Sequence, residues 1–507
     1  DVYKRQGKNV TTNNAKYILF AWEVNKKDIG AFDYKWLPCA MGGDYRKWYG
    51  NIVNVIDWSL EARHFYKTNQ AGRIIREEFW DMSGVTWGKI SSASPSFRYL
   101  DNKQMYQETA VLQKNKNDTL MVLSVLNTKV AQFFLSFLAP TLNFQLQDIC
   151  AIPLPDQLKA VKTEAMKIGK NCVSKCKTDW DSFEISLDFQ HHPLLRKVPT
   201  ISEAFDQWQA ECDDRFNQLK ANEEELNRIF IDIYGLKDEL TPEVEEKDVT
   251  VRKTDLSRDI RSFISYAVGC MFGRYSLDEE GLIYAGGEWD SNRYQTFLPD
   301  DDNCIPITDE EYFQDDIVGR FVEFVKTVYG TDTLEENLDF VANVLGNKGD
   351  TAKEVIRNYF LKDFYTDHLK VYQKRPIYWL FDSGKQNGFK ALIYMHRYDA
   401  DTVGRVRTDY LHRAQKYIEA TMQSAQYTID NASSASEKSK ATKAVTKYTK
   451  QLAEMKIYDE AIAHIANKRI EIDLDDGVKV NYEKFQGVEV AQEGKKALKV
   501  DLLARLK

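Results

Sequence analysis

The segment that decides the fold class is residues 374–396, which read KRPIYWLFDSGKQNGFKALIYMH. Two apolar, aromatic-rich runs, IYWLF from Ile377 to Phe381 and FKALIYMH from Phe389 to His396, flank the polar sequence DSGKQNG. Runs of this composition favour strands, and glycine with asparagine favours a turn between them. The segment therefore predicts a β-hairpin in a chain whose other apolar patterns are mostly helical.

Around this hairpin, apolar residues recur every three or four positions, which is the period of a helix that faces a core. The spacing predicts helices over residues 119–137, 202–234, 255–272, 317–329, 333–345 and 351–365. Asp255 or Ser257 can cap the third of them. Two longer stretches, Leu411–Ala432 and Val445–Ile462, flank a serine-rich turn. They predict two long helices, most simply an antiparallel coiled-coil hairpin.

The first 155 residues alternate aromatic and polar residues, with repeated glycine and asparagine turns. Tyr17–Val24 and Gly84–Ile90 are strand-like, and Ile470–Tyr482 indicates a β-rich tail. The whole pattern predicts a multidomain α+β protein, with a mixed α/β domain followed by a largely helical C-terminal region. We expect these domains: 1–155, a mixed α/β region; 156–254, an acidic helical connector; 255–410, an α+β domain with the β-hairpin near 375–396; 411–470, the antiparallel helical hairpin; and 471–507, a short β-rich tail.

The 507-residue chain has 43% hydrophobic and 29% charged residues, a composition that is ordinary for a globular protein. Its charge is unevenly distributed along the sequence. The net charge is -8. Residues 1–155 carry 19 basic and 14 acidic groups, residues 201–350 carry 14 and 36, and residues 351–507 carry 28 and 21. A basic front, an acidic middle and a basic rear predict different partners for different parts.

The sequence also indicates where the protein works. No apolar run reaches the 18 residues that a membrane span needs, and no signal peptide is visible. The seven cysteines are scattered and odd in number, which favours a reducing compartment, so we expect a cytoplasmic protein. Because the chain begins at Asp1, we expect an excerpt of a longer protein.

Several catalytic motifs are missing from the sequence. It contains no Gly-x-Gly, no P-loop, no His-Glu-x-x-His and no Gly-x-Ser-x-Gly. It contains no adjacent prolines, so the Asn/Asp-Pro-Pro-Tyr/Phe corner of amino-methylating enzymes is missing as well. We therefore expect no catalytic residue and no cofactor site in this chain.

Two groups of residues are candidate metal ligands. Cys172 and Cys176, with His191 and His192 downstream, do not have the spacing of a zinc site. Acidic runs occur at residues 223–225, 300–302 and 309–311. Such runs could hold Mg²⁺ for a nuclease, but a solvated acidic face that turns away from DNA explains them better. We expect no metal site.

The first of two basic loops is GGDYRKWYG, residues 42–50, where Arg46 and Lys47 precede Trp48 and Tyr49. Such a loop can contact phosphates while an aromatic ring stacks on or wedges at a base. The alternative is a surface turn that Trp48 anchors in a core.

The second loop offers Lys89, Ser91, Ser92 and Arg98. Small hydroxyl residues allow close approach to a DNA backbone, and an arginine can bind guanine with two hydrogen bonds. The alternative is a serine-rich turn without a function.

A basic cluster also surrounds the hairpin. It begins at Lys374 and Arg375 and continues through Lys385, Lys390, Arg397, Arg405 and Arg407. The cluster could bind the phosphates of a duplex. A solubilising surface is an equal alternative.

Long strings of the sequence resemble the PglX family, the adenine-specific DNA methyltransferases of bacterial BREX phage-defence systems. The strings are GGDYRKWYG (42–50), NDTLMVLSVLNTKVAQFFLSFLAPTLNFQLQDICAIPLP (117–155), DRFNQLKANEEELNRIFIDIYGL (214–236), RDIRSFISYAVGCMFGRYSLD (258–278) and KRPIYWLFDSGKQNGFKALIYMHRYDADTVG (374–404). The resemblance covers residues from about 7 to 482. It matches the part of these enzymes that follows the catalytic domain.

The resemblance implies that the intact protein transfers a methyl group from S-adenosylmethionine to an adenine flipped out of the duplex. The catalytic and cofactor motifs of the family lie upstream, so none of their residues can be carried over to this chain, which we expect to be inactive alone. The resemblance implies a DNA target-recognition region in residues 1–155, and it favours DNA contact by the two basic loops.

We therefore interpret the chain as the C-terminal, DNA-recognising fragment of a site-specific N6-adenine DNA methyltransferase. Its expected partners are double-stranded DNA and other BREX components, without a membrane. The predicted DNA-binding residues are Arg46, Lys47, Trp48, Tyr49, Lys89, Ser91, Ser92, Arg98, Lys374 and Arg375. The alternative is a protein-interaction scaffold that docks other defence components and has little DNA affinity.

Overall fold

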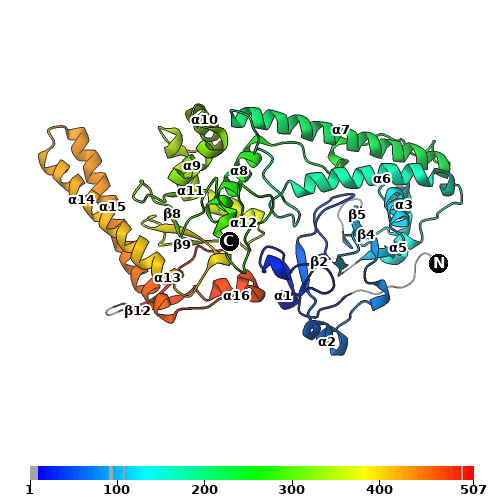
Figure 1. Ribbon diagram of the computed structural model, residues 1–507, viewed down its shortest axis with the longest axis horizontal. Helices are drawn as coiled ribbons and strands as arrows, with labels where there is room; N and C mark the ends of the chain where they lie inside the picture. Colours follow the sequence, from blue (N-terminus) through cyan, green and yellow to red (C-terminus); the bar gives the residue numbers. More distant parts are fainter. Residues whose placement is uncertain (1–8, 91–94, 108, 493–494, 507) are drawn as a thin grey trace. The chain divides into compact units, whose positions relative to one another are not determined.

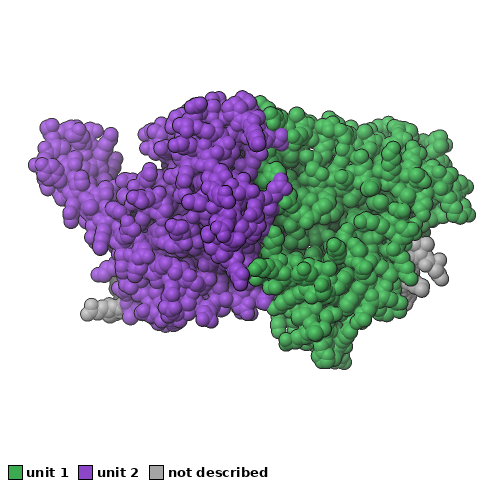
Figure 2. All heavy atoms as spheres, viewed as in Figure 1, with its two compact units in different colours: residues 1–193, 205–254 green, residues 194–204, 255–507 purple. Residues whose placement is uncertain are grey.

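The computed structural model describes residues 9–90, 95–107, 109–492 and 495–506. The chain divides into two compact units (Figure 2). Unit 1 contains residues 1–193 and 205–254, and unit 2 contains residues 194–204 and 255–507. Both units combine helices with small sheets, which confirms the predicted multidomain α+β class.

The sheets of unit 1 are small and mainly antiparallel. A four-stranded sheet has the order β1-β3-β2-β6, and a three-stranded sheet has the order β5-β4-β7. β2 and β6 pair in parallel. Every residue of β4, β5 and β7 is buried, so both faces of this sheet are covered. The strands are β1 Ile18–Phe20, β2 Trp36–Ala40, β3 Asn54–Asp57, β4 Ser83–Trp87, β5 Phe97–Leu100, β6 Met105–Tyr106 and β7 Ala110–Gln113.

The strand predicted at Tyr17–Val24 is only partly correct. Its first residue belongs to a short helix, α1 Asn14–Tyr17, and only β1 follows. Asn13 starts the helix, because its side chain accepts a hydrogen bond from the Lys16 amide. The strand-like segment at Gly84–Ile90 corresponds to β4.

The helix predicted over residues 119–137 is two helices, α3 Lys116–Leu126 and α4 Lys129–Leu138. The break lies at Asn127, whose side chain accepts from the Phe97 amide at 3.1 Å and donates to the Phe97 carbonyl at 3.0 Å. This bond pair holds Asn127 against β5, so the chain bends by 74° and restarts. Among the described residues, no single helix is long and apolar enough to cross a membrane; α3 and α4 pass such a test only as a bent pair.

The remaining helices of unit 1 include two long ones, α6 Leu158–Asp181 and α7 Ile201–Tyr234, which lie side by side (Figure 1). The Asn222 amide donates to Asn171 across this pair at 3.0 Å. The shorter helices are α2 Leu60–Thr68 and α5 Leu146–Cys150. The helical apolar spacing of residues 202–234 corresponds to one packed stripe of α7, in which Trp208 is half-buried and these residues are buried: Phe205, Phe216, Leu219, Leu226 and Phe230.

The predicted helices of unit 2 are present at nearly the expected bounds. Asp255 caps α8 by accepting from the Arg258 amide at 2.7 Å. The helix predicted over residues 351–365 is divided at Asp363 into two. The bounds are α8 Leu256–Met271, α9 Ile317–Tyr329, α10 Leu334–Leu345, α11 Ala352–Lys362 and α12 Phe364–Val371.

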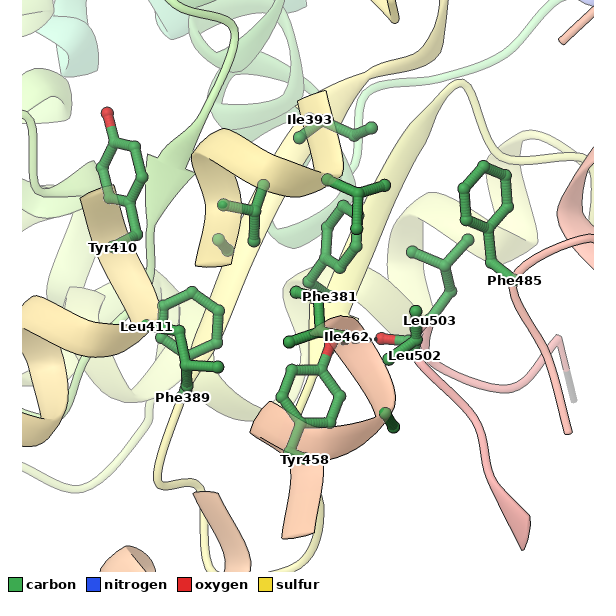
Figure 3. Close-up of a cluster of buried hydrophobic side chains, with 14 of the residues drawn as sticks. Phe381, Phe389, Ile393, Tyr410, Leu411, Tyr458, Ile462, Phe485, Leu502 and Leu503 are labelled. Atoms are coloured by element: carbon green, nitrogen blue, oxygen red, sulfur yellow. Dashed lines mark hydrogen bonds between the residues drawn. The ribbon is translucent and has the colours of Figure 1, made fainter. Parts of the chain in front are cut away.

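The β-hairpin is confirmed. β9 Tyr378–Asp382 and β10 Lys390–Tyr394 pair antiparallel, and β8 Ile305–Pro306 adds a third strand in the order β8-β10-β9. Buried side chains of β9 and β10 pack against residues near the end of the chain, including Leu502 and Leu503. Tyr458 donates to the Leu502 carbonyl at 2.6 Å within this cluster, which Figure 3 shows.

Two long helices follow, α14 His412–Asn431 and α15 Ala435–Lys468, as the apolar spacing predicted. They lie beside each other (Figure 1). A short helix α13 Thr402–Arg405 and a π-helical turn over residues 406–411 lead into α14. A coiled-coil geometry for the pair stays a prediction.

The β-rich tail predicted at Ile470–Tyr482 is wrong for those residues. They contain a helix, α16 Gly477–Glu483, with Val478 and Tyr482 buried at a spacing of four. The helix places both side chains in the core of unit 2. The strands of the tail lie further on, at β11 Val488–Gln492 and β12 Lys495–Val500.

Candidate nucleic-acid interface

The loop of residues 42–50 is fixed to strand β5 by its own backbone. The Trp48 amide donates to the Phe97 carbonyl, and the Tyr99 amide donates to the Trp48 carbonyl, both at 2.8 Å. Gly43 and Gly50 have φ angles of 136° and 120°, which a residue with a Cβ rarely adopts. The glycines therefore allow the loop to turn on both sides of this attachment.

Arg46 is buried against α6. Its guanidinium forms an ion pair with Asp179, and its Nε donates to the Tyr49 carbonyl at 3.0 Å. The ring of Trp180 lies 5.1 Å from the guanidinium carbon. These contacts satisfy the cation inside the protein and leave 8% of the residue exposed.

Lys47 and Trp48 share one carboxylate on α7. Lys47 Nζ lies 2.5 Å from Glu223 Oε2, and Trp48 Nε1 donates to Glu223 Oε1 at 2.6 Å. Burial lowers the pKa of Lys47, but the Glu223 carboxylate, together with Tyr45 and Asp248, opposes this effect, and the net pKa is raised. Lys47 is therefore a buried, paired cation.

Tyr49 completes the loop against α6. The Lys177 ammonium lies 5.0 Å from its ring centre. Burial raises the pKa of the Tyr49 hydroxyl, and the cation of Lys177 opposes this shift. Tyr49 is thus a buried side chain with a neutral hydroxyl.

Arg98 lies on β5 and is 1% exposed. Its Nη1 approaches the Arg46 carbonyl at 3.5 Å, while Nε and Nη2 have no partner among the described residues. Burial, with the neighbouring Arg46 cation, lowers the pKa of Arg98 to about 10. The guanidinium remains charged at neutral pH, and no carboxylate of the described residues lies within ion-pair distance of it.

The expected exposure of these loop side chains is wrong. Arg46, Lys47, Trp48 and Arg98 are all buried, so the structure has the alternative arrangement, a turn that Trp48 anchors in the core. The reason is that α6 and α7 supply Asp179 and Glu223, which bind the two cations internally. Contact of these side chains with DNA remains a prediction, and it would require them to leave this packing.

The other predicted residues differ in accessibility. Lys89 is half-buried, and its carbonyl accepts from the Phe144 amide at 2.8 Å. Ser91 and Ser92 lie outside the described residues. Lys374 is exposed in unit 2 at a φ of 58°, and Arg375 is half-buried beside it.

The basic cluster around the hairpin is mostly neutralised within unit 2. Arg405 pairs with Asp399 at 2.8 Å, and Arg407 pairs with Asp459 at 2.7 Å. Arg397 donates to the Asp300 carbonyl at 2.7 Å. Lys390 donates to the Leu361 carbonyl at 3.0 Å, and Arg375 Nη1 donates to the Lys374 carbonyl at 3.1 Å. Five of the seven described residues therefore have internal partners.

The interpretation of the acidic runs as a solvated face is wrong for two of their members. Glu223 is buried against Lys47, as described above. Asp300 is 9% exposed, and burial with the nearby Asp302 carboxylate raises its pKa to about 7. Tyr410 donates to Asp302 at 2.9 Å and to Asp315 at 2.7 Å. In the part of the chain that the structure describes, no group of three or more His, Cys, Asp or Glu could hold a metal ion.

The residues that sequence reasoning missed are Asp179 and Glu223. They are separated from their partners by 133 and 176 positions, so no local pattern indicates the pairing. Sequence reasoning also missed a pocket of about 640 Å³ in unit 1, with an apolar wall and a lysine rim. Lys162 on that rim pairs with Asp118 at 2.6 Å, and Lys159 pairs with Asp156 at 2.7 Å.

The sequence of the chain is similar to two curated proteins, while no family model matches it. It is 45% identical over 503 residues to the adenine-specific methyltransferase PglX of Lacticaseibacillus casei (strain Zhang), covering 94% of this chain. Over the matched part, the chain is therefore similar to PglX. It is also 34% identical over 523 residues to the adenine-specific methyltransferase BrxX of Escherichia coli O9:H4 (strain HS), covering 95% of this chain.

The PglX-like chain spans 42% of the length of each of these relatives. Coverage of 94% or more means that the similarity runs through both compact units. The resemblance stated from the sequence strings is thereby confirmed.

Proposed function

We propose that this PglX-like chain recognises a DNA sequence and holds the duplex for a site-specific N6-adenine DNA methyltransferase of a BREX phage-defence system. The observation that carries the proposal is the similarity to two adenine-specific methyltransferases over nearly the whole chain. Their names supply the reaction class, and the span of 42% leaves room in such a protein for a separate catalytic domain.

In this proposal the chain contributes no reacting group. S-adenosylmethionine supplies the methyl group in the intact protein, and the sequence of this chain offers neither a Gly-x-Gly turn nor a Pro-Pro corner for it. The role of the chain is to bind the duplex while the target adenine is extruded, which costs a few kcal/mol of unstacking. Binding energy from a large recognition region offsets that cost.

The accessible cations are the candidates for phosphate contact. Among the predicted DNA-binding residues that the structure describes, they are the exposed Lys374 and the half-buried Lys89 and Arg375. We assign the buried residues of the loop 42–50, together with Arg98, the task of holding the loop backbone in place. Phosphate contacts fix the orientation of a protein on the duplex, whereas base contacts specify the sequence.

The test is a fluorescence-anisotropy titration of the chain of residues 1–507 with labelled duplex at several salt concentrations. We expect affinity that falls steeply with salt, because each phosphate contact contributes about 0.9 to the slope of log affinity against log salt. Equilibrium dialysis with labelled S-adenosylmethionine should show no stoichiometric binding.

The proposal fails if the chain has no measurable affinity for duplex DNA at low salt. That result would favour the scaffold alternative, in which the chain docks other BREX components. Stoichiometric cofactor binding would instead show that part of the catalytic machinery lies within this chain.

A further inference from the structure

Helices α14 and α15 form an arm that extends beyond the core of unit 2. Ile418 is the last buried residue of α14, and Ala441 is the one buried residue of α15 before Tyr448 among the described side chains. We define the arm as residues 419–450. Figure 1 shows the two helices running on together past strands β8 and β9, and Figure 2 shows their far end as a protrusion of unit 2.

The base of the arm is fixed to unit 2 by specific contacts. The Tyr417 ring stacks on Tyr312 with 5.6 Å between centres. Tyr448 donates to Glu310 at 3.2 Å, and Lys447 forms an ion pair with Asp309. The arm is therefore held at one end, and its distal part is stabilised by contacts between its own two helices.

The arm carries an unusual row of like charges. Residues 438–450 contain five lysines and no aspartate or glutamate. Four of them, Lys440, Lys443, Lys447 and Lys450, are spaced so that they lie on one face of α15. We call these four residues the lysine row. Lys440, Lys443 and Lys450 are exposed, and the described part of the chain places no carboxylate within ion-pair distance of them.

This arrangement costs stability within the protein. Like charges three or four positions apart on a helix destabilise it by about 0.2–0.5 kcal/mol per pair. The row contains three such pairs, and in the pair of Lys440 and Lys443 neither ammonium has a carboxylate within ion-pair distance among the described residues. A solubilising surface normally mixes both signs of charge, whereas residues 438–450 of α15 contain no aspartate or glutamate. A row of positive charges on an arm with few buried residues is instead suited to binding an external polyanion.

We propose that the lysine row contacts the phosphate backbone of duplex DNA. The first and last lysines of the row are ten positions apart, or about 15 Å along the helix. Over that length a duplex carries roughly four phosphates per strand. The number of lysines in the row is therefore comparable to the number of phosphates on one strand of DNA over the same length. This inference rests on the proposed function, because it names one of the surfaces through which the chain holds its duplex.

The test replaces three lysines in the chain of residues 1–507: Lys440→Gln, Lys443→Gln and Lys450→Gln. The slope of log affinity against log salt should fall by about two to three, at 0.9 per lost phosphate contact. The loss should be equal for all duplex sequences, since phosphates carry no sequence information. Glutamine is a good helix former and removes the repulsion, so the thermal unfolding temperature should not fall.

The matched control removes three exposed lysines of unit 2 outside the arm, Lys348→Gln, Lys353→Gln and Lys479→Gln. This control should leave the slope unchanged, although it alters the net charge equally. An unchanged slope in the arm variant overturns the inference, and so does an equal loss in the control. If the arm variant instead loses only the capture of an acidic protein, the arm is a protein-docking surface and the inference is wrong. If the unaltered chain binds no duplex, both the proposed function and this inference are wrong.

Discussion

The buried pair of Lys47 and Glu223 allows the sharpest test of the structure. In Glu223→Gln the side chain keeps its shape and an oxygen that can accept from Trp48 Nε1, but it loses its negative charge. The Lys47 ammonium, whose side chain is 5% exposed, then loses its ion-pair partner. Breaking a buried ion pair from one side costs about 3–5 kcal/mol.

The expected effect can be read by differential scanning calorimetry. For a unit of this size, 1 kcal/mol shifts the unfolding temperature by about 2–4 °C, so Glu223→Gln should lower it by about 6–20 °C. The double variant with Lys47→Met should recover most of the loss, because it removes the unpaired cation. A double-mutant cycle measures this recovery, and it distinguishes the interaction energy of the pair from a general loss of stability.

The control is Glu225→Gln on the same helix. Glu225 pairs with Arg228 on the surface, where both side chains are more than two-fifths exposed. Exposed pairs contribute about 0–1 kcal/mol, so this variant should unfold close to the unaltered protein. If Glu223→Gln and Glu225→Gln unfold at the same temperature, the buried pair does not exist as described, and Lys47 is free to reach a ligand.

Three further predictions address other parts of the molecule. Arg98→Met should raise the unfolding temperature of unit 1, because it removes a buried cation with two unpartnered nitrogens; a lower calorimetric temperature would show that the guanidinium has a counter-ion. The unfolding free energy of unit 2 should fall as pH rises from about 4 to about 7, by at most about 1.4 kcal/mol per pH unit, since Asp300 stays protonated in the folded state while its unfolded counterpart ionises. In Asp300→Asn, the dependence of the unfolding free energy on pH, measured by urea unfolding, should be weaker. An unchanged dependence would show that another group causes it. Replacing Lys374 and Arg375 by glutamine should lower the salt slope of DNA binding by up to about two in anisotropy titrations; no change would make this surface a solubilising one.

Much of the secondary structure was determined by the sequence, because its causes lie within a few residues. Helix α9 begins and ends where the apolar spacing predicts, and Asp255 caps α8 from the adjacent position. The hairpin of β9 and β10 follows from two aromatic runs around a glycine-rich turn. The long strings that resemble the PglX family also identified the relatives, since similarity needs no knowledge of contacts.

The tertiary structure decided the breaks and the tail. The helix break at Asn127 depends on hydrogen bonds to Phe97, which is 30 positions away. The segment around α16 has few residues and an ambiguous apolar pattern, so its helical form depends on burying Val478 and Tyr482 in the core of unit 2. Local propensity alone gives no preference strong enough to override such packing.

The accessibility of charged residues was decided by the tertiary structure alone. A sequence shows that Arg46 and Lys47 are cations beside aromatic residues, and that Glu223 belongs to an acidic run. It does not show that the chain brings Asp179 and Glu223 to them from positions 133 and 176 residues away. A charge in water and a charge paired in a core have the same letter in the sequence. Only the folded arrangement, through burial and the nearest counter-charge, determines which of them a ligand can reach.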